Sequence, residues 1–258
     1  MMLKRIIYCL YYKDNHFYLS RNFRLQKVGD VKWLIKNFKF DVTANYVDEL
    51  IILHVKNNPS LNDYEGFFKN INFLRKNIFI PITLGGGISN LKQAKQCFLN
   101  GADKILINTA SYNTKKLIND IANLYGSQSI SIMMDYKYLK DKIKLFSKSG
   151  VKSEKITLSN HLSKLSKLSC GEIILNSIDR DGTGQGLDIK ILKLIKKNYN
   201  KPILLMGGAG KPEHFSSALK NSTVSAIITA NLFNFLGDGL KLVRQRLIDD
   251  GIKIAKFY

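Results

Sequence analysis

The feature that most constrains this chain is an internal repeat whose period is about half the chain length. The run Leu-Gly-Gly-Gly-Ile that starts at Leu84 has a counterpart, Met-Gly-Gly-Ala-Gly, that starts at Met206, so Gly85 and Gly207 are 122 positions apart (207 − 85 = 122). Solenoid repeats have only about 20–50 residues. We therefore predict two copies of one half-domain. The same spacing of 122 joins the segments 84–88 with 206–210, 51–53 with 173–175, and 105–109 with 227–231.

Short apolar runs rich in β-branched residues alternate with segments of helical periodicity. Strands that alternate with helices favour parallel strands joined by right-handed crossovers. Eight such strands in 258 residues fit a closed barrel better than an open sheet. We predict an α/β fold, a single (β/α)8 TIM barrel made of two half-barrels at about 1–123 and 124–258. The candidate strands are residues 5–12, 48–54, 80–85, 104–107, 130–135, 172–177, 202–207 and 225–229.

Some helices and loops also follow from the pattern. Leu91 to Leu99 and Leu187 to Lys197 have the periodicity of amphipathic helices. The polar stretches 55–66 and 137–157 follow strands, so we expect loops over one end of the barrel, with a small hairpin in the second. The loops that follow the strands carry the chemistry in barrels of this type.

The chain is strongly basic, with a formal net charge of +20. A basic surface can attract nucleic acid, but the chain has no recognised nucleic-acid motif. We expect a solvated surface that binds no nucleic acid, or a surface that attracts phosphorylated small molecules or an acidic partner protein. The lysines on the expected outer faces of helices are Lys92, Lys95, Lys115, Lys116, Lys190, Lys193, Lys196 and Lys197.

Neither a membrane segment nor a disulfide framework is expected. No stretch approaches the roughly 18–20 apolar residues of a transmembrane helix. The apolar run 4–12 continues into a Lys-Asp pair without a signal-peptide cleavage pattern, so we predict a buried strand there. Cys9, Cys97 and Cys170 lie far apart and form no metal-binding pair. We predict a cytoplasmic protein with reduced cysteines and no metal.

Glycine-rich loops follow two of the predicted strands. Gly86 and Gly87 follow the third strand, and Gly207 and Gly208 follow the seventh. Glycine lets backbone N–H groups approach an anion because no Cβ stands in the way. About twenty residues later each half has a strand-to-helix junction, where free N–H groups and the helix dipole attract phosphate. We therefore predict two phosphate sites on opposite sides of the barrel mouth, for a ligand phosphorylated at both ends. The junctions are Asn108-Thr109 and Ala230-Asn231.

Longer motifs point to a known family. They are Gly-Gly-Gly-Ile at 85–88, Gly-Ala-Asp-Lys at 101–104, Ile-Asn-Thr-Ala at 107–110, Asp-Arg-Asp-Gly-Thr-Gly-Gln-Gly at 179–186 and Gly-Gly-Ala-Gly-Lys-Pro-Glu-His-Phe at 207–215. With them the chain resembles, over nearly its whole length, the cyclase subunit of imidazole glycerol phosphate synthase from histidine biosynthesis. The resemblance implies a duplicated barrel without a cofactor. It also implies a lyase that uses ammonia from a partner glutaminase. The lyase uses that ammonia to split and cyclise a bis-phosphorylated ribonucleotide, which gives imidazole glycerol phosphate and an aminoimidazole carboxamide ribotide.

The resemblance implies an acid–base pair, and one member of that pair is changed. Family members use aspartates on the first and fifth strands as general acid and base. The fifth-strand position is Asp135, but the first-strand position is Tyr11, and their spacing equals that of Lys13 and Lys137 (135 − 11 = 137 − 13 = 124). Tyrosine, with a pKa near 10, is a poor base at neutral pH, and losing one member of such a pair costs about 10²–10⁴ in rate. A family lysine, aspartate and serine are replaced by Leu19, His54 and Met206.

We expect different roles for two other acidic residues near these positions. Asp14 is three residues beyond Tyr11, but strand alternation points it away from the Tyr11 direction, so we do not expect it to replace the missing aspartate. Asp181 is retained. The resemblance implies that Asp181 and Gly182 contact one phosphate end of the ligand or its ribose.

At the opposite, N-terminal end of the barrel, the resemblance implies a ring of four charged residues where ammonia arrives. The matching residues are Arg5, Glu49, Lys104 and Glu172, and all four residue types are retained. Such a ring can simply close the barrel bottom and stabilise it. It can also bar water while ammonia passes. We expect an ammonia gate, with the glutaminase docked at this face.

Three hypotheses for the function remain open. A working cyclase with altered acid–base chemistry explains the glycine loops, Asp135 and Asp181. A repurposed subunit that conducts ammonia from a glutaminase to a third protein explains the retained ring together with Tyr11; relatives of this type are associated with building acetamidino groups on surface sugars. A binder of nucleic acid or anionic surfaces would require basic residues clustered on one face. We favour the second, with the family reaction as the default description.

Overall fold

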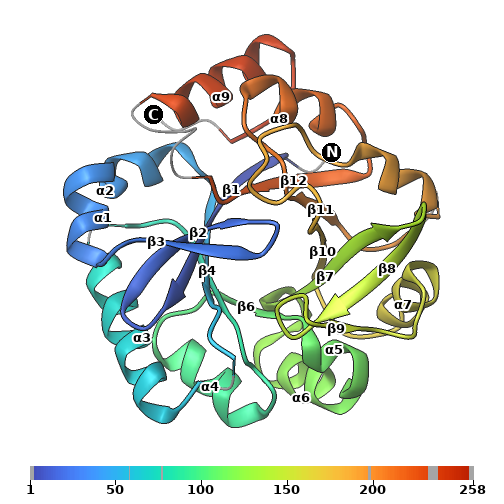
Figure 1. Ribbon diagram of the computed structural model, residues 1–258, viewed down its shortest axis with the longest axis horizontal. Coiled ribbons are helices and arrows are strands. Elements are labelled where there is room, and N and C mark those ends of the chain that lie inside the picture. The colour runs from blue at the N-terminus through green and yellow to red at the C-terminus, as the bar shows by residue number, and fades with distance from the viewer. Residues whose placement is uncertain (1–2, 58, 77, 197–198, 232–237, 256–258) are drawn as a thin grey trace.

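Eight parallel strands close into a single barrel (Figure 1). The computed structural model describes residues 3–255 apart from 58, 77, 197–198 and 232–237. The barrel strands are β1 (Arg5–Lys13), β4 (Glu49–His54), β5 (Ile82–Gly85), β6 (Lys104–Ile107), β7 (Ile130–Leu139), β10 (Glu172–Ser177), β11 (Ile203–Met206) and β12 (Val224–Thr229). They follow one another around the circle in this order, and the β12–β1 pairing closes it. The predicted (β/α)8 barrel is confirmed.

Helices lie on the outside of the barrel (Figure 1). Several begin at caps that the sequence supplies: the Asn90 side chain accepts a hydrogen bond from the Gln93 backbone, and Thr157 does the same for Asn160. The helical elements are α1 (Val31–Phe38), α2 (Phe40–Thr43), η1 (Ala44–Tyr46), α3 (Leu61–Leu74), α4 (Leu91–Leu99), α5 (Thr109–Asn113), α6 (Lys115–Tyr125), η2 (Ser127–Ser129), α7 (Leu158–Leu165), η3 (Ile189–Leu194), α8 (Pro212–Leu219) and α9 (Gly239–Asp249).

Two predicted segments differ from the structure. The helix expected from Leu187 to Lys197 is instead the short 3-10 helix η3, and Lys197 lies outside the described residues. Apolar residues three positions apart suit a 3-10 helix as well as an α-helix, so the pattern did not separate the two. The loop expected over 55–66 is also shorter, because Ser60 and Asp63 form a capping box that starts α3 inside it.

Two β-hairpins extend beyond the barrel strands. The hairpin predicted within 137–157 is present, where β7 continues into β8 (Lys142–Ser147) and β8 pairs with β9 (Lys152–Ser153). A second hairpin, β2 (His16–Arg21) and β3 (Arg24–Gly29), continues from β1 and was not predicted. It crosses in front of the barrel in Figure 1. Its turns use left-handed backbone at Asn15 and Asn22, the conformation that two-residue hairpin turns require.

Alternation along the strands decides which side chains lie inside the barrel. In β1, the side chains of Ile7, Cys9 and Tyr11 lie in the cluster inside the barrel, and the residues between them pack outward with the helices. The interior between the two barrel ends is therefore mostly apolar. The other buried members of the inner cluster are Ile51, Leu53, Leu106, Met133, Ile174, Leu204, Met206, Ala226 and Ile228.

Several predictions from composition can be compared with the structure. Within the described residues, no helix has the length and apolar character needed to cross a membrane. The three cysteines are buried and unpaired with one another, as predicted. The outward position of the singled-out lysines is confirmed at seven positions, which are exposed: Lys92, Lys95, Lys115, Lys116, Lys190, Lys193 and Lys196.

Candidate functional site

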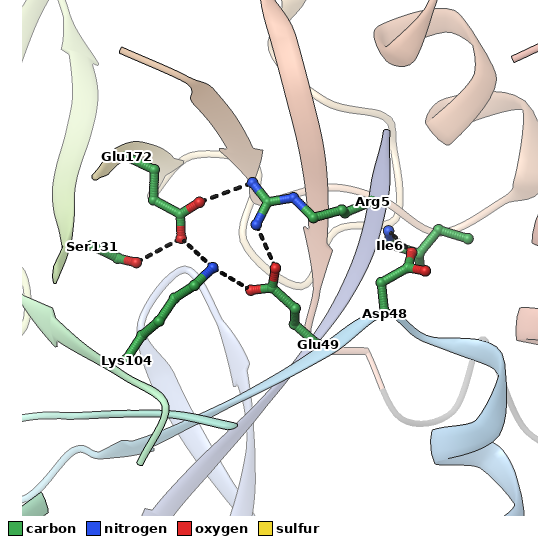
Figure 2. Close-up of polar contacts among 7 residues, drawn as sticks. All are labelled: Arg5, Ile6, Asp48, Glu49, Lys104, Ser131 and Glu172. Atoms are coloured by element: carbon green, nitrogen blue, oxygen red, sulfur yellow. Dashed lines mark hydrogen bonds and ion pairs between the residues drawn. The ribbon is translucent and has the colours of Figure 1, made fainter. Parts of the chain in front are cut away.

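Four charged residues at the starts of four barrel strands form a closed cycle of ion pairs, here called the ion-pair ring (Figure 2). Arg5 pairs with Glu49 and, at 2.8 Å, with Glu172. Lys104 pairs with Glu49 at 2.9 Å and with Glu172 at 3.3 Å. The Ser131 hydroxyl also donates a hydrogen bond to Glu172 at 2.6 Å. The structure thus brings together all four residues named from the sequence, and each has two partners of opposite charge.

The ion-pair ring is mostly withdrawn from solvent and has no net charge. The side chains of both glutamates are 9% exposed, and those of Arg5 and Lys104 are 19% exposed. Burial by itself raises the pKa of Glu172, but Arg5 and Lys104 outweigh it, so the pKa is lowered. Burial likewise opposes the charge on Arg5, but the two glutamates outweigh it and raise its pKa. The arrangement therefore keeps the charges of Arg5 and Glu172 at neutral pH.

At the other end of the barrel interior, Asp135 lies between two side-chain amides. Asn108 Nδ2 donates a hydrogen bond to one carboxylate oxygen at 2.6 Å, and Asn176 Nδ2 donates to the other at 2.9 Å. Asp135 has no cationic partner among the described residues. Burial raises its pKa to about 7, although both amides act in the opposite direction. A carboxyl in this state can take up or release a proton near neutral pH, as a general acid or base must.

Tyr11 lies across the barrel from Asp135, because three strands separate β1 from β7 in either direction around the circle. The residue is buried, and its hydroxyl has no hydrogen-bond partner among the described residues. Burial raises the pKa of Tyr11 well above its usual value, and the nearby Asp181, Cys9 and Asp135 add to the shift. The phenol therefore stays protonated, so that it can donate a hydrogen bond but cannot act as a base at neutral pH.

Two cavities are lined by the residues that follow the barrel strands, and Ser20 lines both. The larger cavity has a volume of about 690 Å³ and the smaller about 230 Å³. Each contains one glycine loop and one of the junctions named above. Among the residues predicted to act in catalysis or to bind the ligand, the larger cavity is lined by Tyr11, Gly86, Gly87, Asn108, Thr109 and Asp135, and the smaller by Asp181, Gly182, Gly207, Gly208, Ala230 and Asn231.

The backbone explains why both loops contain glycine. Gly86 has a φ of +97°, and a Cβ there would lie 1.9 Å from the carbonyl oxygen of His54. Gly208 has a φ of +100°, and a Cβ there would lie 2.2 Å from the carbonyl oxygen of Gly186. A side chain would therefore force these loops apart. The short helix expected after Asn108 is present as α5, whereas the segment after Asn231 lies outside the described residues.

Comparisons with known proteins establish the family. A family model described as "Histidine biosynthesis protein" matches residues 38–237. A protein of Parasynechococcus marenigrum (strain WH8102) named "Putative imidazole glycerol phosphate synthase subunit hisF2" is 40% identical over 247 residues, which cover 95% of this chain and 91% of that protein. Proteins named "Imidazole glycerol phosphate synthase subunit HisF" from Chlorobium phaeovibrioides and Chlorobaculum tepidum are 33% and 32% identical over 254 residues, 98% of this chain and 99% of theirs. The chain belongs to this HisF-like family.

In this HisF-like barrel, Asp181 holds the β2–β3 hairpin in place. The Ser20 hydroxyl and the Phe23 backbone N–H both donate to one Asp181 carboxylate oxygen, the second at 3.0 Å. The Asn22 backbone N–H donates to the Asp181 carbonyl at 3.0 Å. Burial raises the pKa of Asp181, and the contacts with Ser20 and Phe23 oppose that shift. Asp181 is therefore a structural contact of the hairpin as well as a lining residue of the smaller cavity.

The other positions at which the resemblance predicts a departure from the family pattern lie in different places. Leu19 and Met206 line the smaller cavity, which makes that part of its wall apolar. His54 lines the larger cavity, but its ring packs among aromatic residues between β4 and α3 rather than in the inner cluster. Asp14 lies in the β1–β2 turn and pairs with Lys56 at 2.9 Å. Since its side chain is half-exposed there, Asp14 does not take the place of an aspartate at the barrel mouth.

Sequence reasoning missed Asn176, which is buried beside Asp135. The signal was present, because Asn176 is two and four residues beyond Ile174 and Glu172, both of which face the barrel interior. Period-2 alternation therefore places all three side chains on one face of β10. Ser131 follows the same rule on β7, two residues before Met133 of the inner cluster.

Proposed function

We propose that this HisF-like chain is a divergent paralogue of the cyclase subunit that conducts ammonia from a partner glutaminase at its N-terminal face to an acceptor at the opposite face. One contrast carries the proposal: the ion-pair ring is complete, whereas Tyr11 occupies the position across from Asp135. An ammonia route needs the ring and the interior behind it. The family cyclisation also needs a second acid–base group, and a buried phenol with a raised pKa does not supply one at neutral pH.

The chemistry of the interior suits ammonia rather than ammonium. Behind Arg5 and Glu49, the next inward-facing residues are Ile7 and Ile51, which are apolar and buried. Moving an ion into such surroundings is costly because its hydration is lost, whereas a small neutral molecule loses far less. Ammonia released at the ring by a docked glutaminase would therefore be kept as the neutral, nucleophilic form on its way through the barrel.

We propose that the acceptor is a phosphorylated small molecule at the barrel mouth. Each of the two cavities there contains a glycine loop whose left-handed backbone leaves no room for side chains. A surface-sugar precursor on which a third protein builds an acetamidino group fits this arrangement. The relative named hisF2 is 40% identical, against 33% and 32% for the two HisF proteins compared above, which supports membership of a second type of subunit. Unpaired buried cysteines accord with a cytoplasmic location.

A second candidate function is the family's own cyclase reaction. The observation in its favour is Asp135, a buried carboxyl with a pKa of about 7, beside the larger cavity. Asp181 is a buried carboxyl that lines the smaller cavity, but Ser20 and Phe23 already occupy one of its oxygens. A working cyclase would have to operate with Asp135 and a partner other than an aspartate at position 11.

An ammonia-driven cyclase assay separates the two candidates. The purified chain would receive the family's bis-phosphorylated ribonucleotide and excess ammonium chloride, beside the HisF protein of Chlorobaculum tepidum as the reference. We expect turnover at least about 10²-fold below that reference, and a partial recovery in Tyr11→Asp, because the acid–base pair is restored. Tyr138→Phe, which removes a hydroxyl bonded to Asp188 instead, should recover nothing. Turnover of the unmodified chain near that of the reference would refute the conduit proposal.

Gene neighbourhood offers an independent check. A conduit of the proposed type should be encoded beside a glutaminase and sugar-modifying enzymes. A cyclase of the ordinary type should be encoded beside other enzymes of histidine biosynthesis, and that finding would count against the proposal.

A further inference from the structure

We propose that Arg21 and Arg24 of the β2–β3 hairpin bind a doubly charged phosphoryl group of the ligand in the smaller cavity. The inference deepens the proposed function and rests on it for the identity of the ligand, because it states which side chains hold the phosphate of the acceptor. Neither arginine belongs to the glycine loops or the strand-to-helix junctions. Both therefore add a selectivity for charge that backbone groups alone do not give.

The register of the hairpin places both arginines on one face. Arg21 lies directly opposite Arg24, and residues that are directly opposite in an antiparallel pair share a face of the sheet. The adjacent Ser20–Leu25 pair lies on the other face, and Leu25 lines the larger cavity. The hairpin, which crosses in front of the barrel in Figure 1, therefore turns its arginine face toward the smaller cavity. The residues of that face, all of which line the smaller cavity, are Leu19, Arg21, Arg24 and Gln26.

The two positive charges of the hairpin lie opposite each other without an acid to balance them. Arg21 and Arg24 are both exposed, and neither forms an ion pair within the part of the chain that the structure describes. Like charges at directly opposite positions of two strands destabilise the pairing of those strands. An anion that both guanidinium groups contact would remove this repulsion.

Asp181 is the one acid among the described lining residues of the smaller cavity. One of its carboxylate oxygens accepts hydrogen bonds from the Ser20 hydroxyl and the Phe23 backbone N–H. The two arginines outnumber this single carboxylate, so the cavity wall keeps an excess of positive charge. The wall therefore attracts an anion even with Asp181 ionised.

The turn of the hairpin is fastened to the barrel, so the arginines start from fixed backbone positions. Asn22 Nδ2 donates to the carbonyl oxygens of Ile178 and Asp179, both at 3.0 Å. Gly182 allows this close approach, because a Cβ there would lie 2.1 Å from the Ser20 carbonyl oxygen. Binding then has to order only the two arginine side chains, which costs less entropy than ordering a loose loop.

A phosphoryl group matches the chemistry of this cavity. The planar guanidinium group offers paired N–H donors that fit two phosphoryl oxygens, and it stays charged at any pH at which the protein is folded. Gly207 and Gly208 also line the cavity, and their φ values of +95° and +100° suit residues without a Cβ. The cavity volume of about 230 Å³ suits a phosphate or a diphosphate rather than a segment of a macromolecule.

Nuclear magnetic resonance of the full chain tests the site directly. The backbone amide signals of Gly207 and Gly208 report on the smaller cavity, and those of Gly86 and Gly87 report on the larger. The chain would be titrated with sodium phosphate at about pH 8, where phosphate carries nearly two charges, and with sodium acetate at equal ionic strength. We expect saturable shifts at Gly207 and Gly208 that need much less phosphate than acetate.

The double variant Arg21→Gln/Arg24→Gln should weaken phosphate binding at Gly207 and Gly208 by at least about tenfold, because charge-assisted hydrogen bonds are lost. The midpoint at Gly86 and Gly87 should stay the same. The matched control is Lys32→Gln/Lys36→Gln, which removes two exposed charges from α1 outside both cavities. Because distant exposed charges are screened, it should change the midpoint by less than about twofold.

Thermal unfolding without phosphate shows whether the double variant is intact. Its unfolding temperature should be no lower than that of the natural chain, because the repulsion between Arg21 and Arg24 is gone. A titration with pyrophosphate identifies the source of the group: tighter binding than phosphate assigns the site to a diphosphate, and equal binding assigns it to a monophosphate. In both cases the arginines bind the group.

Four results would overturn the proposal. They are the absence of saturable shifts with phosphate, equally tight binding of acetate, unchanged phosphate binding by the double variant, and an equal loss of binding at both glycine loops. The titration needs neither a glutaminase nor an ammonia acceptor. It can therefore succeed where the cyclase assay refutes the conduit proposal, and its failure would leave that proposal standing.

Discussion

The two ends of this barrel treat buried carboxylates in opposite ways. At the N-terminal end, Glu172 faces Arg5 and Lys104, which lower its pKa despite burial. At the C-terminal mouth, Asp135 is as well buried but has amides and no cation beside it among the described residues, and burial raises its pKa to about 7. A buried carboxyl therefore stabilises the fold at one end of the barrel and has a pKa close to neutral pH at the other. Such unpaired, perturbed groups are typical of functional sites, where stability is often lower than it need be.

Breaking the ion-pair ring should have the largest effect on stability. Glu172→Leu leaves Arg5 and Lys104 sharing one carboxylate and removes the acceptor of Ser131. Because removing one partner of a buried pair strands the opposite charge, we expect a loss of about 3–5 kcal/mol in the free energy of unfolding in urea. Lys116→Ala, which breaks an exposed helical pair, should change it by less than about 0.5 kcal/mol. Similar small losses for both variants would contradict the structural contrast.

The ring should also show a characteristic pH dependence. A lowered carboxyl pKa contributes stability that is fully present above the unfolded value and is lost as pH falls through the folded value. The pKa of Glu172 is lowered from 4.5. The stability gap between the natural chain and Glu172→Leu should therefore be constant at neutral pH and shrink below about pH 4.5.

Asp135→Asn should change the free energy of unfolding by less than Glu172→Leu does, and in the opposite direction. At pH 8 the natural chain buries an ionised carboxylate without a cation, so the variant should be more stable by about 1–2 kcal/mol. Since a raised carboxyl pKa favours folding at low pH, the natural chain regains stability as pH falls from about 7 toward 4, and the advantage should be smaller at pH 5. Urea unfolding at both pH values measures the difference. If the extra stability of the variant is the same at both pH values, the Asp135 carboxyl does not change its protonation state between them.

Asp120→Asn is the control for that experiment. Asp120 pairs with Lys116 on the surface of α6, and its side chain is 34% exposed. The stability difference between this variant and the natural chain should hardly change between pH 5 and 8.

The smallest effect is expected at Asp181, which lines the smaller cavity and contacts the β2–β3 hairpin. Ser20→Ala removes one hydrogen bond to it and should cost about 1 kcal/mol, mostly as easier opening of the hairpin. Amide hydrogen exchange of β2 and β3 would report this opening. Ser166→Ala, which removes an exposed local bond to Ser163, should leave exchange in the hairpin unchanged. Unchanged exchange in Ser20→Ala would mean that Asp181 does not hold the hairpin.

Much of the barrel followed from local sequence patterns. Strands such as β6 and β10 could be predicted to the residue, because each is a short apolar run followed by a turn or loop. The residues of the ion-pair ring could be named from the family resemblance, and strand alternation accounts for their common inward direction. The same alternation rule would have found Asn176, had it been applied beyond the apolar residues of β10.

Other features depended on contacts between distant segments. The β2–β3 hairpin is polar and mostly exposed, so it has no strong apolar alternation, and its place is set by bonds from Asn22 and Phe23 to the segment after β10. The segment around Ile191 forms a 3-10 helix although its apolar spacing also suits an α-helix. Local periodicity does not contain that information.

The sequence alone determined the barrel, its inward-facing residues and the presence of a tyrosine at position 11, because these depend on strand periodicity, chain length and residue identity. Only the tertiary structure decided that the four ring charges neutralise one another. It also decided that, within the part of the chain that the structure describes, Asp135 has amides and no cation beside it and the Tyr11 hydroxyl has no partner. Each of these properties depends on groups that several different strands contribute. Burial and neighbouring charge, which set pKa values and leave hydrogen-bonding atoms unsatisfied, exist only once the strands have closed into a barrel.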